Sequence, residues 1–194
     1  MFSTRSLITG FVAIAIVGVG LTLLAGPETP RSGVEKGSIL PAYNPTHVTG
    51  PDKGTATCPV CKYPRNPAVQ VWVHTDDEKN VTAIAKELEN IARSHSEAKF
   101  KPFVVFVNAK REDGEALGAR LQELGTRLGL EHVALAYLPG PDHPAVKGYG
   151  INTDPSVKNT VFVYKNRTVE AKFVNLKGDQ KGLTALRQAV NKVL

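Results

Sequence analysis

Apolar and polar residues follow two distinct patterns between residue 68 and the C-terminus, and each pattern predicts one kind of secondary-structure element. Short runs rich in β-branched and aromatic residues indicate strands. They predict strands at 68–74, 102–108 and 132–138, and two strands within 160–174 around a turn at 165–168. Apolar residues spaced three and four apart indicate helices. They predict helices at 80–95, 114–130 and 182–194, and a loop with a short helix over 139–151.

The predicted elements follow a simple order along the chain: strand, helix, strand, helix, strand, then a β-hairpin and a last helix. Strands that are joined through helices are expected to run parallel, with right-handed crossovers. The hairpin adds antiparallel strands. The sequence therefore predicts one α/β domain over 68–194, with a mixed sheet and helices on both faces.

The N-terminus follows a different pattern. Residues 7–26 form an apolar run of 20 residues without a charged side chain, which is about the length that a bilayer-spanning helix needs. Arg5 precedes the run, so the flanking charge would keep the start in the cytoplasm and send the rest outward. The same features describe a secretory signal peptide with cleavage after Ala25. Residues 1–26 are therefore interpreted as a hydrophobic helix, either a membrane anchor or a cleaved signal peptide.

Two segments separate this run from the predicted domain. Residues 27–57 are rich in Pro, Gly, Ser and Thr and are interpreted as a tether leading into irregular structure. Residues 58–67 form a loop that holds both cysteines of the chain. An export signal at the N-terminus predicts an extracytoplasmic protein on the periplasmic side, membrane-anchored or secreted.

Composition and charge narrow the class of protein further. Hydrophobic residues make up 42% of the chain and charged residues 22%, which is typical of a globular protein. The formal net charge is +6, but the lysines and arginines are scattered among acids. No basic run is interleaved with aromatic residues as single-strand nucleic-acid binders require. We therefore expect no nucleic-acid partner.

Two stretches resemble a known superfamily. Residues 147–173 read KGYGINTDPSVKNTVFVYKNRTVEAKF and are similar to the part of thioredoxins and peroxiredoxins that leads into the C-terminal hairpin. Residues 36–50 read KGSILPAYNPTHVTG and are similar to the opening of extracytoplasmic redoxin domains. Together with the order of elements, the resemblance implies a thioredoxin-like fold, a three-layer α/β/α arrangement with a mixed sheet, over 68–194.

The resemblance also implies a place for a reactive thiol, at the start of the helix after the first predicted strand. Asp76, Asp77 and Glu78 stand there instead. Thr75 matches the peroxiredoxin Thr-x-x-Cys pattern, but Glu78 takes the cysteine position, and a carboxylate cannot attack peroxide. Asn159 stands just before the hairpin strand, where the family has a cis proline. We therefore expect no peroxidase activity, and we expect the acidic residues to cap the helix.

The remaining candidate chemistry lies in the motif Cys-Pro-Val-Cys at 58–61, upstream of the first strand. The leading interpretation is thiol-disulfide exchange with a thiol- or disulfide-bearing protein partner, because nearby cysteines outside the cytoplasm are oxidised or cycled by a partner. By analogy with the family, Cys58 is taken as the more exposed nucleophile and Cys61 as the resolving thiol. Lys62 and Arg65 are the nearest positive charges that lower a thiol pKa.

Two other interpretations of the pair stay open. A disulfide between Cys58 and Cys61 would close a very small loop, as a structural clip on a non-enzymatic scaffold that binds a partner. The motif also resembles one knuckle of a zinc ribbon, so the two thiolates are alternative ligands for zinc, with a second chain completing the site, or for copper(I). No other cofactor is expected.

Overall fold

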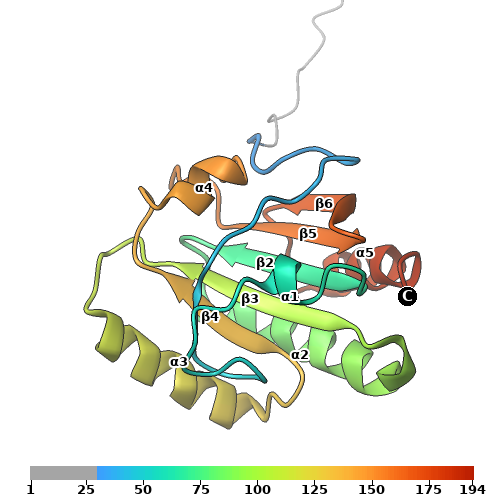
Figure 1. Ribbon diagram of the computed structural model, residues 1–194, viewed down its shortest axis with the longest axis horizontal. Helices are drawn as coiled ribbons and strands as arrows, with labels where there is room; N and C mark the ends of the chain where they lie inside the picture. Colours follow the sequence, from blue (N-terminus) through green and yellow to red (C-terminus); the bar gives the residue numbers. More distant parts are fainter. Residues whose placement is uncertain (1–29) are drawn as a thin grey trace, which may run out of the picture.

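The computed structural model describes residues 30–194, and Figure 1 shows a central sheet with elements packed on both sides. Within these residues the sheet has six strands in the order β1-β4-β3-β2-β5-β6. The strands are β1 Thr46–His47, β2 Ala68–Val73, β3 Lys101–Val107, β4 Ala134–Leu138, β5 Asn159–Lys165 and β6 Thr168–Val174. The helices are α1 Pro59–Lys62, α2 Glu78–Ser94, α3 Gly114–Leu128, α4 Pro144–Gly148 and α5 Gln180–Asn191, with a 3-10 turn at Ser96–Ala98.

The sheet is mixed, as predicted from the order of elements. β2, β3 and β4 run parallel, while β5 and β6 form an antiparallel hairpin beside β2. The short β1 pairs antiparallel with β4 at the opposite edge. Every element predicted from residue 68 onward is present, and its ends differ from the prediction by three residues at most.

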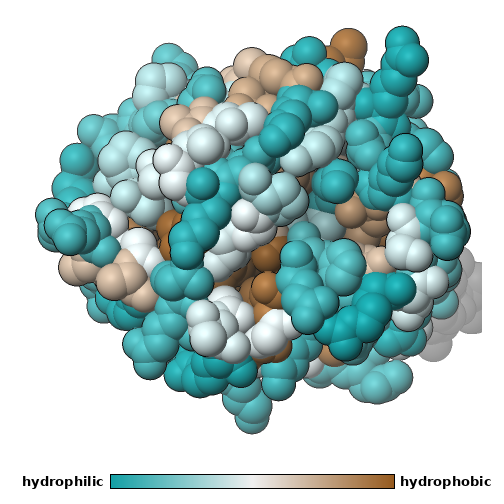
Figure 2. Space-filling model, turned by 60° about the horizontal axis from the view of Figure 1, so that its bottom comes forward, coloured by the Kyte–Doolittle hydropathy of each residue, from teal (hydrophilic) through white to brown (hydrophobic). Residues whose placement is uncertain are grey.

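The three long helices cover one face of the sheet. Both parallel crossovers step in the same direction, from β2 to β3 and from β3 to β4, and right-handed crossovers then put α2 and α3 on the same face. α5 joins them. Val71, Ile84, Leu121, Val161 and Leu186 meet in this core and are buried. On the side of the molecule seen in Figure 2, hydrophilic residues predominate and hydrophobic residues show mainly in hollows.

The opposite face is covered mainly by irregular chain. Residues 30–63 cross it, and only the short α1 and α4 are helical there. Leu40 and Tyr43 from this segment pack with Trp72 of β2 and with Tyr149 at the end of α4. Helices were predicted on both faces. The two long crossover helices, α2 and α3, lie on the same face as α5, and only α1 and α4 are on this one. This layer therefore consists of short helices and loops.

The N-terminal part of this segment also covers a sheet edge. Residues 37–40 run along β6, where Gly37 N donates to Val169 O (2.8 Å) and Val169 N donates to Ser38 O (3.0 Å). An uncovered edge strand presents unpaired backbone groups that invite association with other chains. The pairing with residues 37–40 removes part of that exposed edge.

The N-terminal sequence was interpreted as a hydrophobic helix at 1–26 followed by a tether at 27–57, and the structure describes only residues from 30 onward. The hydrophobic helix predicted at 1–26 lies outside the described residues. Among residues 30–194, no helix combines the length and the apolar character that crossing a bilayer requires. Residues 30–57, most of the segment interpreted as a tether, are irregular apart from β1, which pairs with β4 in the sheet. Leu40 and His47 in this segment are at most 1% exposed.

Candidate functional site

Cys58 and Cys61 are joined by a disulfide at the start of α1. Cys58 is the N-cap residue of this helical turn, and its carbonyl oxygen accepts from the N–H groups of Cys61 (3.2 Å) and Lys62 (3.0 Å). Cys61 is exposed and Cys58 is half-buried. This is the reverse of the exposure expected from the sequence, because the turn directs the first cysteine toward the sheet and the second toward solvent.

A buried carboxylate lies beside the cysteine turn. Asp52 is 4% exposed, and it accepts from the Lys62 ammonium group and from the Tyr63 hydroxyl (3.2 Å). The hydrogen bond to Asp52 raises the pKa of Lys62 above its usual value. The positive charge of Lys62 is therefore directed at Asp52 and is less available to stabilise a thiolate at Cys61 than the sequence suggested.

A buried histidine holds the other side of the turn. His47 is 1% exposed, and its Nε2 lies 2.8 Å from the carbonyl oxygen of Thr57, the residue before Cys58. A carbonyl can only accept, so Nε2 carries the proton and donates. Asp52 and His47 both come from the loop around β1, so this loop fixes both ends of the cysteine turn. Neither contact was predictable from the sequence, because the partners are ten residues apart and no regular element joins them.

The disulfide does not lie at the start of α2, where the resemblance implied a reactive thiol. Cys58 packs against the cluster that contains Trp72 and Tyr149, on the face of the sheet opposite to α2. Figure 1 shows α1 in front of the sheet and α2 behind it. The sheet therefore separates Cys58 and Cys61 from the helix start, and the pair does not replace the missing thiol there.

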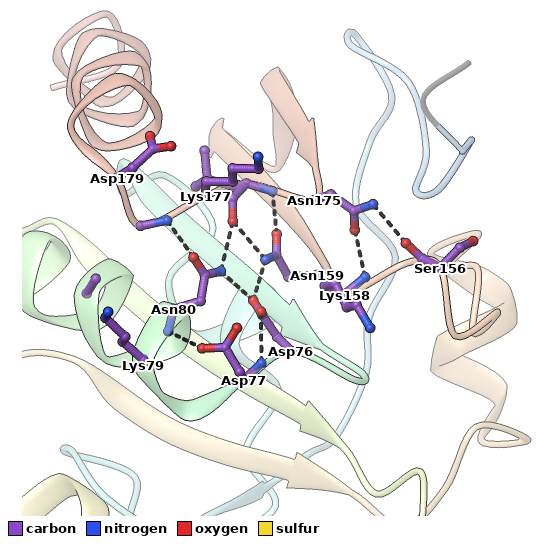
Figure 3. Close-up of a pocket in the computed structure, with 13 residues that line it drawn as sticks. Asp76, Asp77, Lys79, Asn80, Ser156, Lys158, Asn159, Asn175, Lys177 and Asp179 are labelled. Atoms are coloured by element: carbon purple, nitrogen blue, oxygen red, sulfur yellow. Dashed lines mark hydrogen bonds between the residues drawn. The ribbon is translucent and has the colours of Figure 1, made fainter. Parts of the chain in front are cut away.

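The start of α2 holds a network of carboxylates and amides instead (Figure 3). Asp77 caps the helix by accepting from Asn80 N (2.8 Å), which confirms the predicted capping role. The Asp76 carboxylate accepts from the side-chain amides of Asn80 (2.7 Å) and Asn159. These groups line a hollow of about 550 Å³ between α2, β5 and the loop before α5.

Asn159 connects this helix start to the loop that leads into α5. Its amide donates to Leu176 O (3.0 Å), and its carbonyl oxygen accepts from Leu176 N (2.9 Å). Asn80 accepts from Gly178 N in the same loop. No cis peptide bond occurs among residues 30–194. At the place where thioredoxins and peroxiredoxins have a thiol facing a cis proline, this chain has amides and carboxylates that hydrogen-bond to one another, and no thiol.

The fit of this loop against α2 gives a testable prediction. Gly178→Ala is expected to lower the free energy of unfolding by about 1–3 kcal/mol, because the new Cβ would lie 2.6 Å from Ala83 Cβ and 3.1 Å from Asn80 O. Gly118→Ala in α3 is the control, since its Cβ would come no closer than 4.0 Å to Tyr137. There alanine is expected to stabilise by up to about 1 kcal/mol. Urea unfolding measures both; an unchanged midpoint for Gly178→Ala contradicts the close fit.

The described residues contain one group of side chains with the spacing of metal ligands: Glu89, Glu131 and His132. Glu89 accepts from His132 N (2.9 Å) and His132 Nδ1 (2.7 Å). Burial raises the pKa of Glu89, but these hydrogen bonds outweigh it and hold the pKa below its usual value. The contacts fix the start of β4. Cys58 and Cys61, the alternative metal ligands, belong to no such group in residues 30–194.

The strand order and the hairpin define the fold as thioredoxin-like, as the resemblance implied. No family model and no curated protein matches the sequence. Solved structures do. A protein from Chlorobium tepidum assigned as thiol:disulfide interchange protein DsbE is 13% identical with a TM-score of 0.61, over 82% of this chain and 98% of that one.

Two further similar structures are peroxidases or their relatives. The thiol peroxidase from Chromobacterium violaceum is 17% identical with a TM-score of 0.59, over 86% of this chain and 94% of that one. Peroxidoxin BcpB from Mycobacterium tuberculosis is 15% identical with a TM-score of 0.57, over 79% and 97%. Structural similarity at such low sequence identity shows the fold alone. The activity of this chain has to be argued from its own residues.

Proposed function

We propose that this protein is an exported thiol-disulfide exchange protein that works through Cys58 and Cys61. The observation that carries the proposal is the disulfide itself, with the sulfur-bearing side chain of Cys61 exposed to a partner. The similarity in fold to a protein assigned as DsbE supports a redox role. The apolar run at 7–26 supports a place outside the cytoplasm, anchored in the membrane or released from it.

Exchange with a reduced partner takes two steps. A partner thiolate attacks Cys61 Sγ, the bond between Cys58 and Cys61 breaks, and Cys58 leaves as a thiolate that takes up a proton. The second partner thiolate then attacks the partner sulfur of the mixed disulfide and releases Cys61 as a thiol. The partner dithiol loses two electrons and two protons, and this protein gains them. The reverse sequence reduces a partner disulfide.

Exposure decides the order of attack. An attacking thiolate must approach along the axis of the S–S bond and therefore needs access to one sulfur. Cys61 is exposed at the surface of the turn, while Cys58 packs against the aromatic cluster below it. We therefore assign Cys61 as the sulfur that reacts with partners and Cys58 as the resolving one.

The reduction potential of the pair tests the proposal. The purified full chain, prepared without chelator, is equilibrated in glutathione and dithiothreitol buffers, and its free thiols are counted by mass after alkylation. A potential between about −120 and −270 mV, the span of known exchange proteins, is the expected result. A potential below about −300 mV is typical of structural disulfides and would contradict an exchange role.

A non-enzymatic scaffold is the second candidate function. It is favoured by the saturated network at the start of α2 and by the firm attachment of the cysteine turn through Asp52 and His47. Here the disulfide is a clip, or the reduced pair binds zinc or copper(I). Metal analysis of the reduced protein distinguishes the last case: half an equivalent of zinc per chain, held between two chains, or one equivalent of copper(I), bound through both thiolates, would replace exchange with a metal site.

A further inference from the structure

Positive charge gathers around the exposed half of the disulfide. Five cations lie on the cysteine turn or on the two segments beside it: Lys53, Lys62, Arg65, Lys99 and Lys101. We call these five the basic collar. Four of them are exposed, and Lys101 is half-buried. The acids on the same segments are Asp52, which is buried, and Glu97, which is exposed.

Contacts in the structure bring the collar together from separate parts of the chain. The aromatic ring of Tyr63, directly after α1, has Lys62 Nζ 5.4 Å and Lys101 Nζ 4.9 Å from its centroid. The side-chain amide of Asn66 donates to Lys99 O (2.8 Å), which places Lys99 beside the loop that carries Arg65. These contacts bring Lys99 and Lys101 next to the segment that follows the cysteine turn, although both are remote from it in sequence.

Most of this charge has no internal partner. Lys62 pairs with Asp52. Among residues 30–194, the other four members of the collar form no ion pair with a carboxylate. Exposed and uncompensated charge of one sign attracts ligands of the opposite sign and speeds their association.

We propose that the basic collar selects a partner whose reactive cysteine lies in an acidic segment. The inference rests on the proposed exchange function and names the partner class for the same disulfide. Complementary charge brings the partner thiol to Cys61 more often and holds it during attack. Asp52 contributes little opposing field to this surface because it is buried and already paired with Lys62.

Peptide disulfides of defined charge test the proposal. The reduced full chain is mixed with disulfide-linked peptide dimers of equal length, whose single cysteine is flanked by glutamates, by glutamines or by lysines. We expect the acidic dimer to be reduced about tenfold faster than the basic one at low ionic strength. The difference should shrink strongly in about 1 M salt, where the screening length falls to about 3 Å.

Two charge-reversal variants show whether the collar is responsible. Arg65→Glu/Lys99→Glu removes collar charge without replacing either cysteine, and it is expected to abolish or invert the preference among the peptide dimers. Lys181→Glu/Lys192→Glu is the matched control. It changes the net charge equally at exposed positions on and beside α5, on the other face of the sheet, and should keep the preference.

The outcomes separate the acidic-partner inference from the exchange function on which it rests. Equal rates for acidic and basic dimers, or a preference that survives Arg65→Glu/Lys99→Glu, would overturn the acidic-partner inference and leave exchange intact. Collar-dependent binding to vesicles of anionic lipid without discrimination among the peptides would overturn it in favour of a membrane contact. Failure to reduce any dimer would remove the exchange function and the inference with it.

Discussion

Cys58→Ser is expected to stop exchange at a mixed disulfide, and Cys61→Ser is expected to stop it before one forms. Turnover needs both sulfurs, so neither variant should reduce a substrate above the uncatalysed rate. They should differ in what accumulates. With Cys58 replaced, the exposed Cys61 thiol still attacks glutathione disulfide and keeps one glutathione, because no resolving thiol remains. With Cys61 replaced, the half-buried Cys58 is shielded and reacts slowly.

Mass spectrometry of the two reduced variants after timed exposure to glutathione disulfide measures this difference. Reduced wild-type protein is the control, since it should release glutathione and close its own disulfide. Loss of the cross-link is itself expected to lower stability by about 2 kcal/mol for so small a loop, so circular dichroism must first show that both variants are folded. Faster adduct formation by Cys61→Ser would restore the order of attack expected from the sequence.

Asn159→Ala is expected to lower the free energy of unfolding by about 3 kcal/mol. Asn159 is 1% exposed, and its side chain bonds both backbone groups of Leu176 and the carboxylate of Asp76. Alanine leaves Leu176 N–H without a partner and takes one donor from a partly buried carboxylate. Each such loss costs about 1–3 kcal/mol.

Urea unfolding of Asn159→Ala against Asn90→Ala measures this effect. Asn90 is exposed on α2, and its replacement should change the free energy of unfolding by no more than about 0.5 kcal/mol. A loss below about 1 kcal/mol for Asn159→Ala would mean that the network adds little to the fold. At temperatures where the variant is folded, exchange through Cys61 should be unaffected, because the sheet separates the two sites.

The strands and helices were predictable because their signals are local. The spacing of Val81, Ile84, Leu88 and Ile91 predicts one buried helical face whatever packs against it, and α2 covers all four. Asp77 before the helix predicts the cap that the structure contains. The mixed sheet follows from the order of the elements alone.

The second layer and the details of the site were not predictable in the same way, because they depend on contacts between distant residues. The resemblance placed Asp76 and Asn159 at the thiol and cis-proline positions of the family, but nothing local predicts that their side chains bond across 83 residues. The exposure of Cys58 and Cys61 depends on how residues 46–57 hold the turn, through Asp52 and His47. Composition alone described that loop only as irregular.

The route of residues 30–43 across the sheet has a consequence for the timing of folding. Ser32 bonds Thr160 at a separation of 128 residues (2.6 Å), and Gly33 N donates to Gly150 O (2.8 Å). Residues 32 and 33 are synthesised early, but they can form these hydrogen bonds only after residues 150 and 160 have been made. Contacts between residues so far apart in sequence form slowly. A chain threaded through a membrane during synthesis would complete this layer only on the far side.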